Sequence, residues 1–275
     1  MTFKTGLYRL ASRLILAAGV FASLFPFYWA AIAATNESGK VFAKPPQLVP
    51  GNMLVENLVN LNASIGIFRV LFNSLFVALA YTAVSLTVCT MAGYAFAKFR
   101  FRGSNVLFSI FLVSMMVPMH ATLIPLFKMM ASLEWLNTYK ALILPNLAYP
   151  FAIFLMRQNM LAVPDAILEA GRIDGVGEWR LFTGIVLPSM RPALAAAAIY
   201  LFMYQWNNFL WPLVATSTKE MYTLPVALSS LIGLSRIDYG QVMTGVTLAT
   251  GPIVVFFLIL QRQFISGILG GAIKE

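Results

Sequence analysis

The feature that most constrains this chain is a set of long stretches without Asp, Glu, Lys or Arg. They cover residues 14–36, 70–97, 103–127, 141–156, 192–218 and 239–261. A helix needs about 20 mainly apolar residues to cross roughly 30 Å of hydrocarbon, and five stretches are long enough by themselves. The fourth is shorter and contains Pro145 and Pro150, but it can span if Tyr139 and Lys140 lie in the headgroup layer. We therefore predict an all-α polytopic membrane protein forming a single transmembrane domain over 1–275. Its six transmembrane helices are expected at about 14–34, 70–97, 105–127, 139–156, 190–212 and 240–260.

Composition supports a membrane protein and argues against nucleic-acid binding, an internal disulfide and a Cys/His metal site. Of 275 residues, 60% are hydrophobic and 11% are charged, against about 25% charged in soluble domains. The net charge of +9 falls on too little polar surface to indicate nucleic-acid binding. With one cysteine, Cys89, and one histidine, His120, the chain cannot form an internal disulfide or a Cys/His metal cluster.

The distribution of Lys and Arg predicts the orientation. If six spans place both ends on one side, that side carries twelve basic residues and the other carries seven. The positive-inside bias then assigns both termini to the cytoplasm, with the 98–102 turn as the strongest signal. We favour a retained first span over a cleaved signal peptide, because the apolar run exceeds a typical h-region and ends in aromatic residues. The uncharged stretch 221–235 is predicted to be a loop with a short surface helix.

The segment between the fourth and fifth spans is unusually acidic. It carries Asp165, Glu169, Asp174 and Glu178, four of the chain's ten acids. A helix is predicted from Asp165, preceded by Pro164, to a stop at Asp174-Gly175. Its small residues suit insertion into a cleft of another protein. The alternative is a helix resting on lipid headgroups, but its acidity disfavours an anionic surface.

This segment resembles a known motif. Glu169-Ala170-Gly171, then Gly175, then Ile185-x-Leu187-Pro188 resemble the EAA loop of binding-protein-dependent ABC importer permeases, a motif written Glu-Ala-Ala, three residues, Gly, nine residues, Ile-x-Leu-Pro. Only Gly171 departs from it. The stretches 93–101, 136–139, 172–175 and 206–212 are similar to the carbohydrate-uptake subgroup, particularly to the smaller permease subunit of maltose-type and glycerol-phosphate-type importers.

The resemblance implies a type I ABC importer permease fold in a bacterial or archaeal plasma membrane. It also implies partners: a second permease subunit completing the pore, two ATPase subunits and an extracytoplasmic solute-binding protein. The EAA coupling segment would be 163–188, with Glu169, Ala170, Gly171, Asp174 and Gly175 serving ATPase coupling. The sequence contains no Gly-x-x-x-x-Gly-Lys-Ser/Thr. We therefore expect no enzymatic activity and no cofactor in this chain, with ATP and Mg bound by the partner ATPase.

Polar residues of the fifth span are candidates for the transport pathway. Tyr200, Tyr204, Asn207 and Trp211 are spaced by 4, 3 and 4 residues, which predicts one helical face, flanked by Asn208. Such a face either lines the translocation cavity or packs against other helices, and we favour packing or gating. His120 and the membrane prolines carry no assigned transport role.

Three other functions stay open at this level. The solute could be glycerol 3-phosphate or another compound rather than a sugar or oligosaccharide. An ion-coupled secondary transporter would need paired intramembrane acids, which the six stretches lack. A membrane-embedded enzyme would need a convergent catalytic cluster, which is not evident.

Overall fold

The computed structural model describes residues 2–233 and 237–272, and it describes side chains for 11–233 and 237–262. Every regular element in these ranges is a helix or a helical turn. The chain forms two compact units: Met1–Phe68 with Ala227–Pro252, and Arg69–Val226 with Ile253–Glu275. The described structure therefore confirms the all-α class.

The first unit contains α1 (Thr2–Ala34), the short η1 (Ser38–Lys40), α2 (Leu54–Ile65) and the first part of α14 (Tyr239–Ala272). Asn57, only 4% exposed, ties α2 to the end of α1. Its Nδ2 donates to the carbonyls of Ala34 and Asn36 at 2.8 and 3.0 Å. α14 approaches the same amide at Gly240, where a Cβ would lie 2.7 Å from Asn57 Oδ1. One buried amide thus joins three helices.

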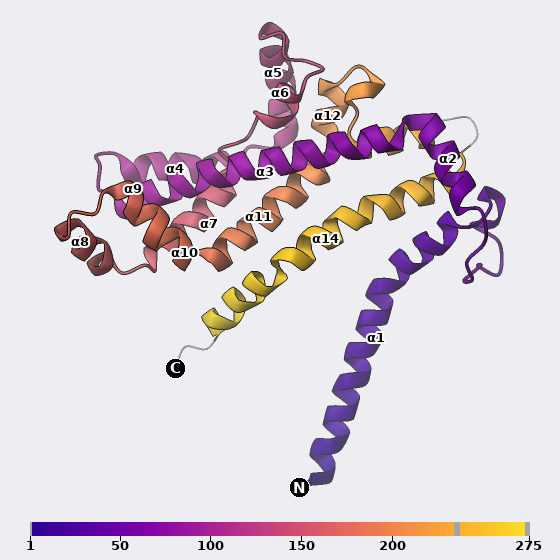
Figure 1. Ribbon diagram of the computed structural model, residues 1–275, viewed down its shortest axis with the longest axis horizontal. Helices are drawn as coiled ribbons and strands as arrows, with labels where there is room; N and C mark the ends of the chain where they lie inside the picture. The colour runs from indigo at the N-terminus through magenta and orange to yellow at the C-terminus, as the bar shows by residue number, and fades with distance from the viewer. Residues whose placement is uncertain (1, 234–236, 273–275) are drawn as a thin grey trace. The chain divides into compact units, whose positions relative to one another are not determined.

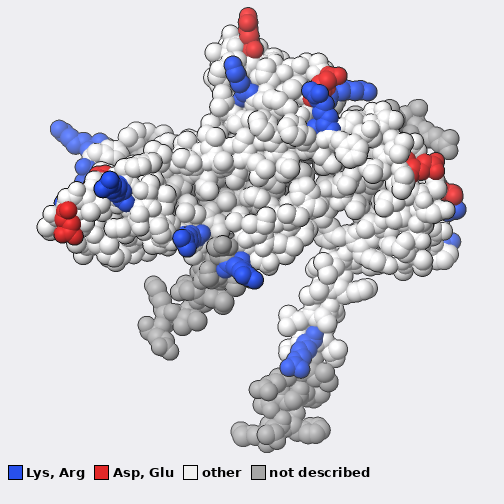
Figure 2. Space-filling model, in the orientation of Figure 1, with Lys and Arg blue, Asp and Glu red and all other residues white. Residues whose placement is uncertain are grey.

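The second unit is built around α3 (Ile67–Lys98), which belongs to it from Arg69 onward (Figure 1). Its other elements are α4 (Ser104–Ser114), α5 (Met119–Ser132), α6 (Tyr139–Ile143), α7 (Pro150–Leu161), α8 (Asp165–Ile173), α9 (Glu178–Leu181), the π-turn η2 (Phe182–Val186), α10 (Leu187–Ser189), α11 (Arg191–Trp206), α12 (Leu210–Ala215) and η3 (Lys219–Met221). α7 packs against both α4 and α11. Figure 2 shows a broad surface over α3 without charged side chains, as expected for a helix facing lipid or other apolar helices.

Gly93 sets the close approach of α3 to α7. A Cβ at this position would lie 2.6 Å from Met156 Cβ and 2.9 Å from the backbone nitrogen of Arg157. Because the obstructing atoms include backbone, a side chain here would force the two helices apart. The glycine therefore fixes the interhelical distance.

Three of the six expected spans are continuous helices, and three are broken. Ala11–Ala34, Ile67–Lys98 and Tyr239–Arg262 are each long and apolar enough to cross a membrane, and up to six spans result if each bent pair of helices counts as one. The expected span 105–127 is bent by 101° between α4 and α5, where Pro118 precedes the first turn of α5. The expected span 139–156 is interrupted between α6 and α7 by residues 144–149, a segment that holds Pro145 and places Asn146 at φ +62°.

Two further expectations need correction. The span expected at 190–212 is not one helix, because α11 ends at Trp206 and α12 begins at Leu210. The predicted surface helix within 221–235 exists as α13 (Leu224–Ile232), but Leu224 and Ala227 are each 1% exposed. The helix is partly buried because removing its apolar side chains from water is favourable. Residues 234 and 235 of that stretch lie outside the described residues.

Candidate coupling helix and membrane cleft

α8 folds where the sequence predicts, for local reasons. Pro164 precedes it and Asp165 occupies its first turn, near the positive end of the helix dipole. It ends in a left-handed glycine cap. Gly175 has φ +74°, its N–H donates to Arg172 O at 3.1 Å, and the N–H of Val176 donates to Gly171 O at 2.9 Å. This Schellman arrangement satisfies the last carbonyls and fixes where the helix stops.

One side of α8 faces the protein. Leu168 is 1% exposed and belongs to a buried cluster with Leu181, Phe182 and Met160. Gly171 lies beside it, and a Cβ at Gly171 would come within 2.5 Å of Leu181 Cδ2. The glycine that departs from the family motif is therefore matched to a large neighbour on α9.

The opposite side of α8 is uncovered in this chain. By helical geometry, Ala166, Ala170 and Ile173 point away from Leu168, with Glu169 at their edge. All four are exposed, and Ile173 is 86% exposed. An apolar, small-residue surface with one carboxylate at its margin can be approached closely by another protein.

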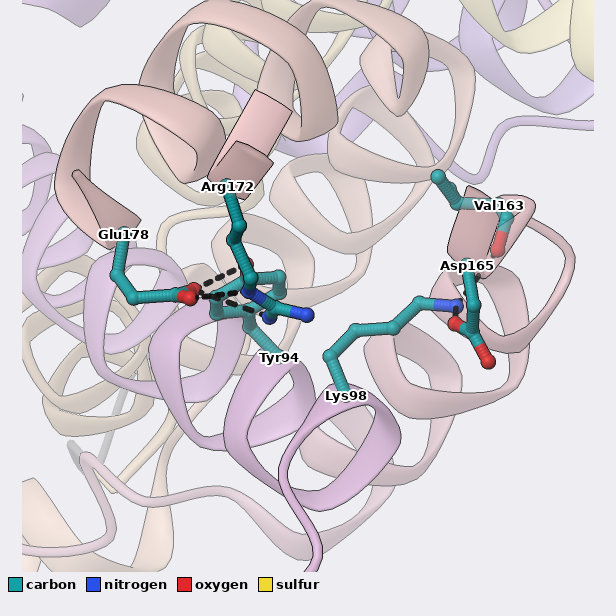
Figure 3. A network of polar contacts seen from close by, with 6 residues as sticks. All are labelled: Tyr94, Lys98, Val163, Asp165, Arg172 and Glu178. Atoms are coloured by element: carbon teal, nitrogen blue, oxygen red, sulfur yellow. Dashed lines mark hydrogen bonds and ion pairs between the residues drawn. The ribbon is translucent and has the colours of Figure 1, made fainter. Parts of the chain in front are cut away.

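Two polar anchors hold α8 to α3 (Figure 3). The first is Lys98, the last residue of α3, whose side chain is only 3% exposed. Its Nζ donates to Val163 O and to Asp165 Oδ1, both at 2.6 Å. The hydrogen bond from Lys98 lowers the pKa of the Asp165 carboxyl below its ordinary value. A buried ammonium is thus satisfied at the very start of α8.

The second anchor joins both ends of the turn after α8. Arg172 Nε donates to Glu178 Oε1 at 2.5 Å and its Nη2 donates to Oε2 at 3.3 Å. The Tyr94 hydroxyl of α3 donates to the same Oε2 at 3.2 Å. The hydrogen bond from Arg172, together with its positive charge, lowers the pKa of Glu178. Two polar contacts and the buried cluster therefore hold α8 against α3.

The Ile-x-Leu-Pro part of the motif produces an irregular helix. The N–H of Leu187 donates to Phe182 O, five residues earlier, closing the π-turn η2. Pro188 has no N–H to continue the α-helical ladder toward Gly184. π-turns are frequently found at functional sites, and this one lies between α9 and α10, on the path from α8 to α11.

A separate cleft of about 630 Å³ lies where the broken helices meet. Its walls come from the α4–α5 break, the segment before α7 and one side of α11. The lining residues are Phe111, Ser114, Met115, Val117, Pro118, Met119, Thr122, Asn146, Ala148, Tyr149, Pro150, Phe151, Tyr200 and Tyr204. None of these residues is charged.

Tyrosines form the polar part of this cleft. The hydroxyls of Tyr149 and Tyr200 are 3.0 Å apart, and the ring of Tyr149 lies 4.8 Å from that of Tyr204. The Tyr204 hydroxyl contacts Met119 Sδ at 3.8 Å. The site thus combines aromatic faces with hydroxyl groups in a largely apolar wall.

The structure divides the residues predicted to share one face of the fifth span. Tyr200 and Tyr204 line the cleft, but the expectation of a common face with Asn207 and Trp211 is wrong, because the helix breaks at 207–209. Asn207 Nδ2 donates to Met203 O at 2.8 Å within the end of α11. Trp211 is 5% exposed and its Nε1 donates to Ala141 O at 2.8 Å. The Asn207 contact stabilises the end of α11, and the Trp211 contact joins α12 to α6.

The two remaining polar candidates also lie outside the cleft lining. Asn208 follows the end of α11, and its N–H donates to Gln205 O at 3.2 Å. His120 lies in the first turn of α5 and is exposed. Neither contributes to the tyrosine group.

Comparison with known proteins agrees with this architecture. Residues 89–270 match the family described as binding-protein-dependent transport system inner membrane component. This chain belongs to that family. The match covers α8, the π-turn and most of the second unit, so the EAA-type segment lies within the shared region.

Several transport permeases are similar to this family member over nearly their whole length. The lactose transport system permease protein LacG of Rhizobium radiobacter is 38% identical over 93% of both chains. The arabinooligosaccharides transport system permease protein AraQ of Bacillus subtilis is 35% identical over 97% of this chain and 96% of its own. The sn-glycerol-3-phosphate transport system permease protein UgpE of Yersinia pestis is 36% identical over 93% and 94%. The relatives are transport permeases rather than enzymes.

The fold matches a solved transporter. A chain of a bacterial ABC transporter involved in the import of the acidic polysaccharide alginate superposes with a TM-score of 0.80, covering 94% of this chain and 96% of that one, at 20% identity. The permease fold is therefore that of an ABC importer. The chain is an inner-membrane component of such a transporter and functions together with other subunits.

Sequence reasoning missed two parts of these sites. Tyr149 completes the tyrosine group, but it lies in a non-helical segment about fifty residues before its partners, so helical spacing could not reveal it. Lys98 was predicted only as an orientation signal, whereas it is buried and bonded to the start of α8. A lysine ending a long apolar helix just before the basic turn was the only available hint.

Proposed function

We propose that this protein is one of two permease subunits of an ATP-driven, binding-protein-dependent importer of a sugar or oligosaccharide. It would form half of the translocation pore, with both termini in the cytoplasm. A solute-binding protein would deliver the substrate from outside. Membership of the family supports the assignment to ABC importers. The lactose and arabinooligosaccharide permeases among the relatives support the assignment of a sugar or oligosaccharide as substrate.

The single observation that carries the coupling role is the uncovered side of α8. Glu169 and Ala170 would contact a separate ATPase subunit, which would bind ATP and Mg. Gly171, Asp174 and Gly175 would act indirectly, because Gly171 seats the helix on Leu181 and the other two end it. Two ATPases would each hold one such helix, one per permease subunit, and their closure would rock the spans between inward- and outward-open states.

A crosslinking experiment tests this role. Glu169→Cys is introduced and the assembled transporter is treated with a short bifunctional thiol–amine reagent; the native Cys89 is fully buried and stays unreactive. We expect a crosslink to the ATPase subunit from position 169. Glu134→Cys, also exposed but expected on the other membrane side, serves as the matched control. Absence of a product from position 169 in an intact complex would refute the proposal.

The tyrosine cleft supports a neutral substrate. We propose that Tyr149, Tyr200 and Tyr204 line part of the pathway, where aromatic faces stack on sugar C–H groups and hydroxyls exchange hydrogen bonds with sugar hydroxyls. A phosphate ester would need cationic partners to offset its desolvation, and the residues lining this cleft carry none. Glycerol 3-phosphate is the second candidate, favoured by the UgpE relative.

Uptake into proteoliposomes that contain the complete transporter distinguishes the two substrates. We expect accumulation of lactose or arabinotriose and none of sn-glycerol 3-phosphate. Tyr200→Phe should reduce uptake several-fold while binding-protein-stimulated ATP hydrolysis persists. Uptake of the phosphate ester alone would replace the sugar assignment but leave the coupling role intact.

A further inference from the structure

A second cleft, unrelated to the tyrosine group, lies at the turn between α3 and α4. It has a volume of about 620 Å³ and also borders α7. Its lining residues are Phe96, Ala97, Phe99, Arg100, Phe101, Arg102, Gly103, Ser104, Asn105, Val106, Arg157 and Leu161. Three arginines and no acid contribute to it, so it is a concentrated positive site.

Among the described residues, no carboxylate forms an ion pair with the arginines of this cleft. The ion pairs among the described residues join Lys40 to Glu37, Lys98 to Asp165 and Arg172 to Glu178. Arg100, Arg102 and Arg157 take part in none of these pairs. Arg100 acts on the Asp165 carboxylate only at longer range, so the three guanidinium groups are available to bind an anion from outside the chain.

The guanidinium of Arg157 is oriented by two contacts that leave part of it free to bind an anion. Its Nε donates to Phe96 O at 3.3 Å, and its guanidinium carbon lies 4.1 Å from the centre of the Phe108 ring. The carbonyl and the ring fix the plane of the guanidinium. Its two Nη groups make no hydrogen bond within the part of the chain that the structure describes, leaving a fork suited to phosphate oxygens.

The surroundings of the cleft indicate what carries the anion. The cleft lies at the ends of two apolar helices, where α3 stops at Lys98 and α4 begins at Ser104. Phe99 and Phe101 are each 41% exposed, and Val106 is 65% exposed. A small soluble anion would leave this apolar rim unused. A phospholipid would place its headgroup among the arginines and its acyl chains along the rim.

We propose that this arginine cleft binds an anionic phospholipid of the surrounding membrane. The lipid phosphate lies against Arg157 and the basic turn, and the acyl chains follow the exposed apolar residues of α4. Because α3 also carries the Lys98 contact to α8, the lipid occupies the same end of the helix that anchors the coupling segment. The site is independent of which solute is transported.

Native mass spectrometry of the purified transporter complex tests the proposal, with phosphatidylglycerol as the probe and phosphatidylcholine as the neutral comparison. We expect the wild-type complex to retain phosphatidylglycerol in preference to phosphatidylcholine. Arg100→Gln combined with Arg102→Gln should weaken phosphatidylglycerol binding about 25-fold, at roughly fivefold per charge. Lys128→Gln combined with Lys219→Gln removes the same charge elsewhere and should change it little.

Two further measurements keep the test decisive. Arg157→Lys retains the positive charge but loses the two Nη groups of the guanidinium, so it should still lower the affinity for phosphatidylglycerol. Unchanged affinity would refute the contact between Arg157 and the lipid phosphate. Inorganic phosphate at 10 mM should not displace the lipid, and full displacement would identify a site for a free anion instead. Equal retention of both lipids by the wild-type complex, or equal losses in the two double variants, would overturn the proposal.

Discussion

Replacing Gly171 by alanine restores the Glu-Ala-Ala pattern, yet the structure predicts that it destabilises this protein. Helix propensity favours alanine over glycine by about 1 kcal/mol. The added Cβ would lie 2.5 Å from Leu181 Cδ2, against roughly 3.5–4.0 Å for a comfortable carbon–carbon contact. Leu181 is fully buried, so it must retreat by about 1 Å into occupied space.

The magnitude follows from these opposing effects. Overpacking of this kind costs about 1–3 kcal/mol, and the obstructing atom is the end of a flexible side chain, which places the cost toward the middle of that range. Subtracting the propensity gain leaves a net loss of about 1 kcal/mol. The apparent melting temperature of the purified protein should fall by about 3 °C.

Tryptophan fluorescence during heating of the detergent-solubilised protein measures this shift. Gly19→Ala is the matched control, because Gly19 lies within α1 and a Cβ there would meet nothing within 4 Å; its melting temperature should rise. In a Leu181→Ala background the obstruction is gone, so Gly171→Ala should become stabilising. An equal rise for Gly171→Ala and Gly19→Ala in the wild-type background would refute the packing argument.

Three other outcomes follow from the same geometry. Gly93→Ala should lower the melting temperature more than Gly171→Ala, because its Cβ meets backbone of α7, and a smaller shift would contradict the close helix contact. Lys98→Ala should increase amide hydrogen exchange in 163–173, since it removes both contacts at the start of α8; unchanged exchange there would make the contact dispensable. The folded-state pKa of Glu178 is depressed, so its pair with Arg172 stabilises the turn above the ordinary glutamate pKa and is lost as the pH falls through the lowered value. The protection factor of amides in the turn, which is the exchange rate corrected for its intrinsic pH dependence, should therefore stay constant above the ordinary glutamate pKa and fall at lower pH, whereas Arg172→Gln should move that midpoint upward.

α8 was largely predictable because its determinants are local. Pro164 and Asp165 begin it and Gly175 ends it, and each acts on backbone within a few residues. The six apolar stretches were predictable for a similar reason, since hydrocarbon imposes a length and a composition on every span. The breaks at Pro118 and Pro145 were not predicted, because a proline can also lie within a span that is only kinked.

Tertiary structure decided everything that depends on distant neighbours. No proline or glycine lies within 207–209, yet α11 stops there, while Trp211 beyond the break bonds to Ala141. Tyr149 joins Tyr200 only because α7 packs on α11, and Lys98 is buried only because α8 folds back onto α3. Composition and spacing determine where a chain can enter a membrane and where helices begin. Which side chains then meet is set by packing between segments far apart in sequence, for which a single sequence contains no local signal.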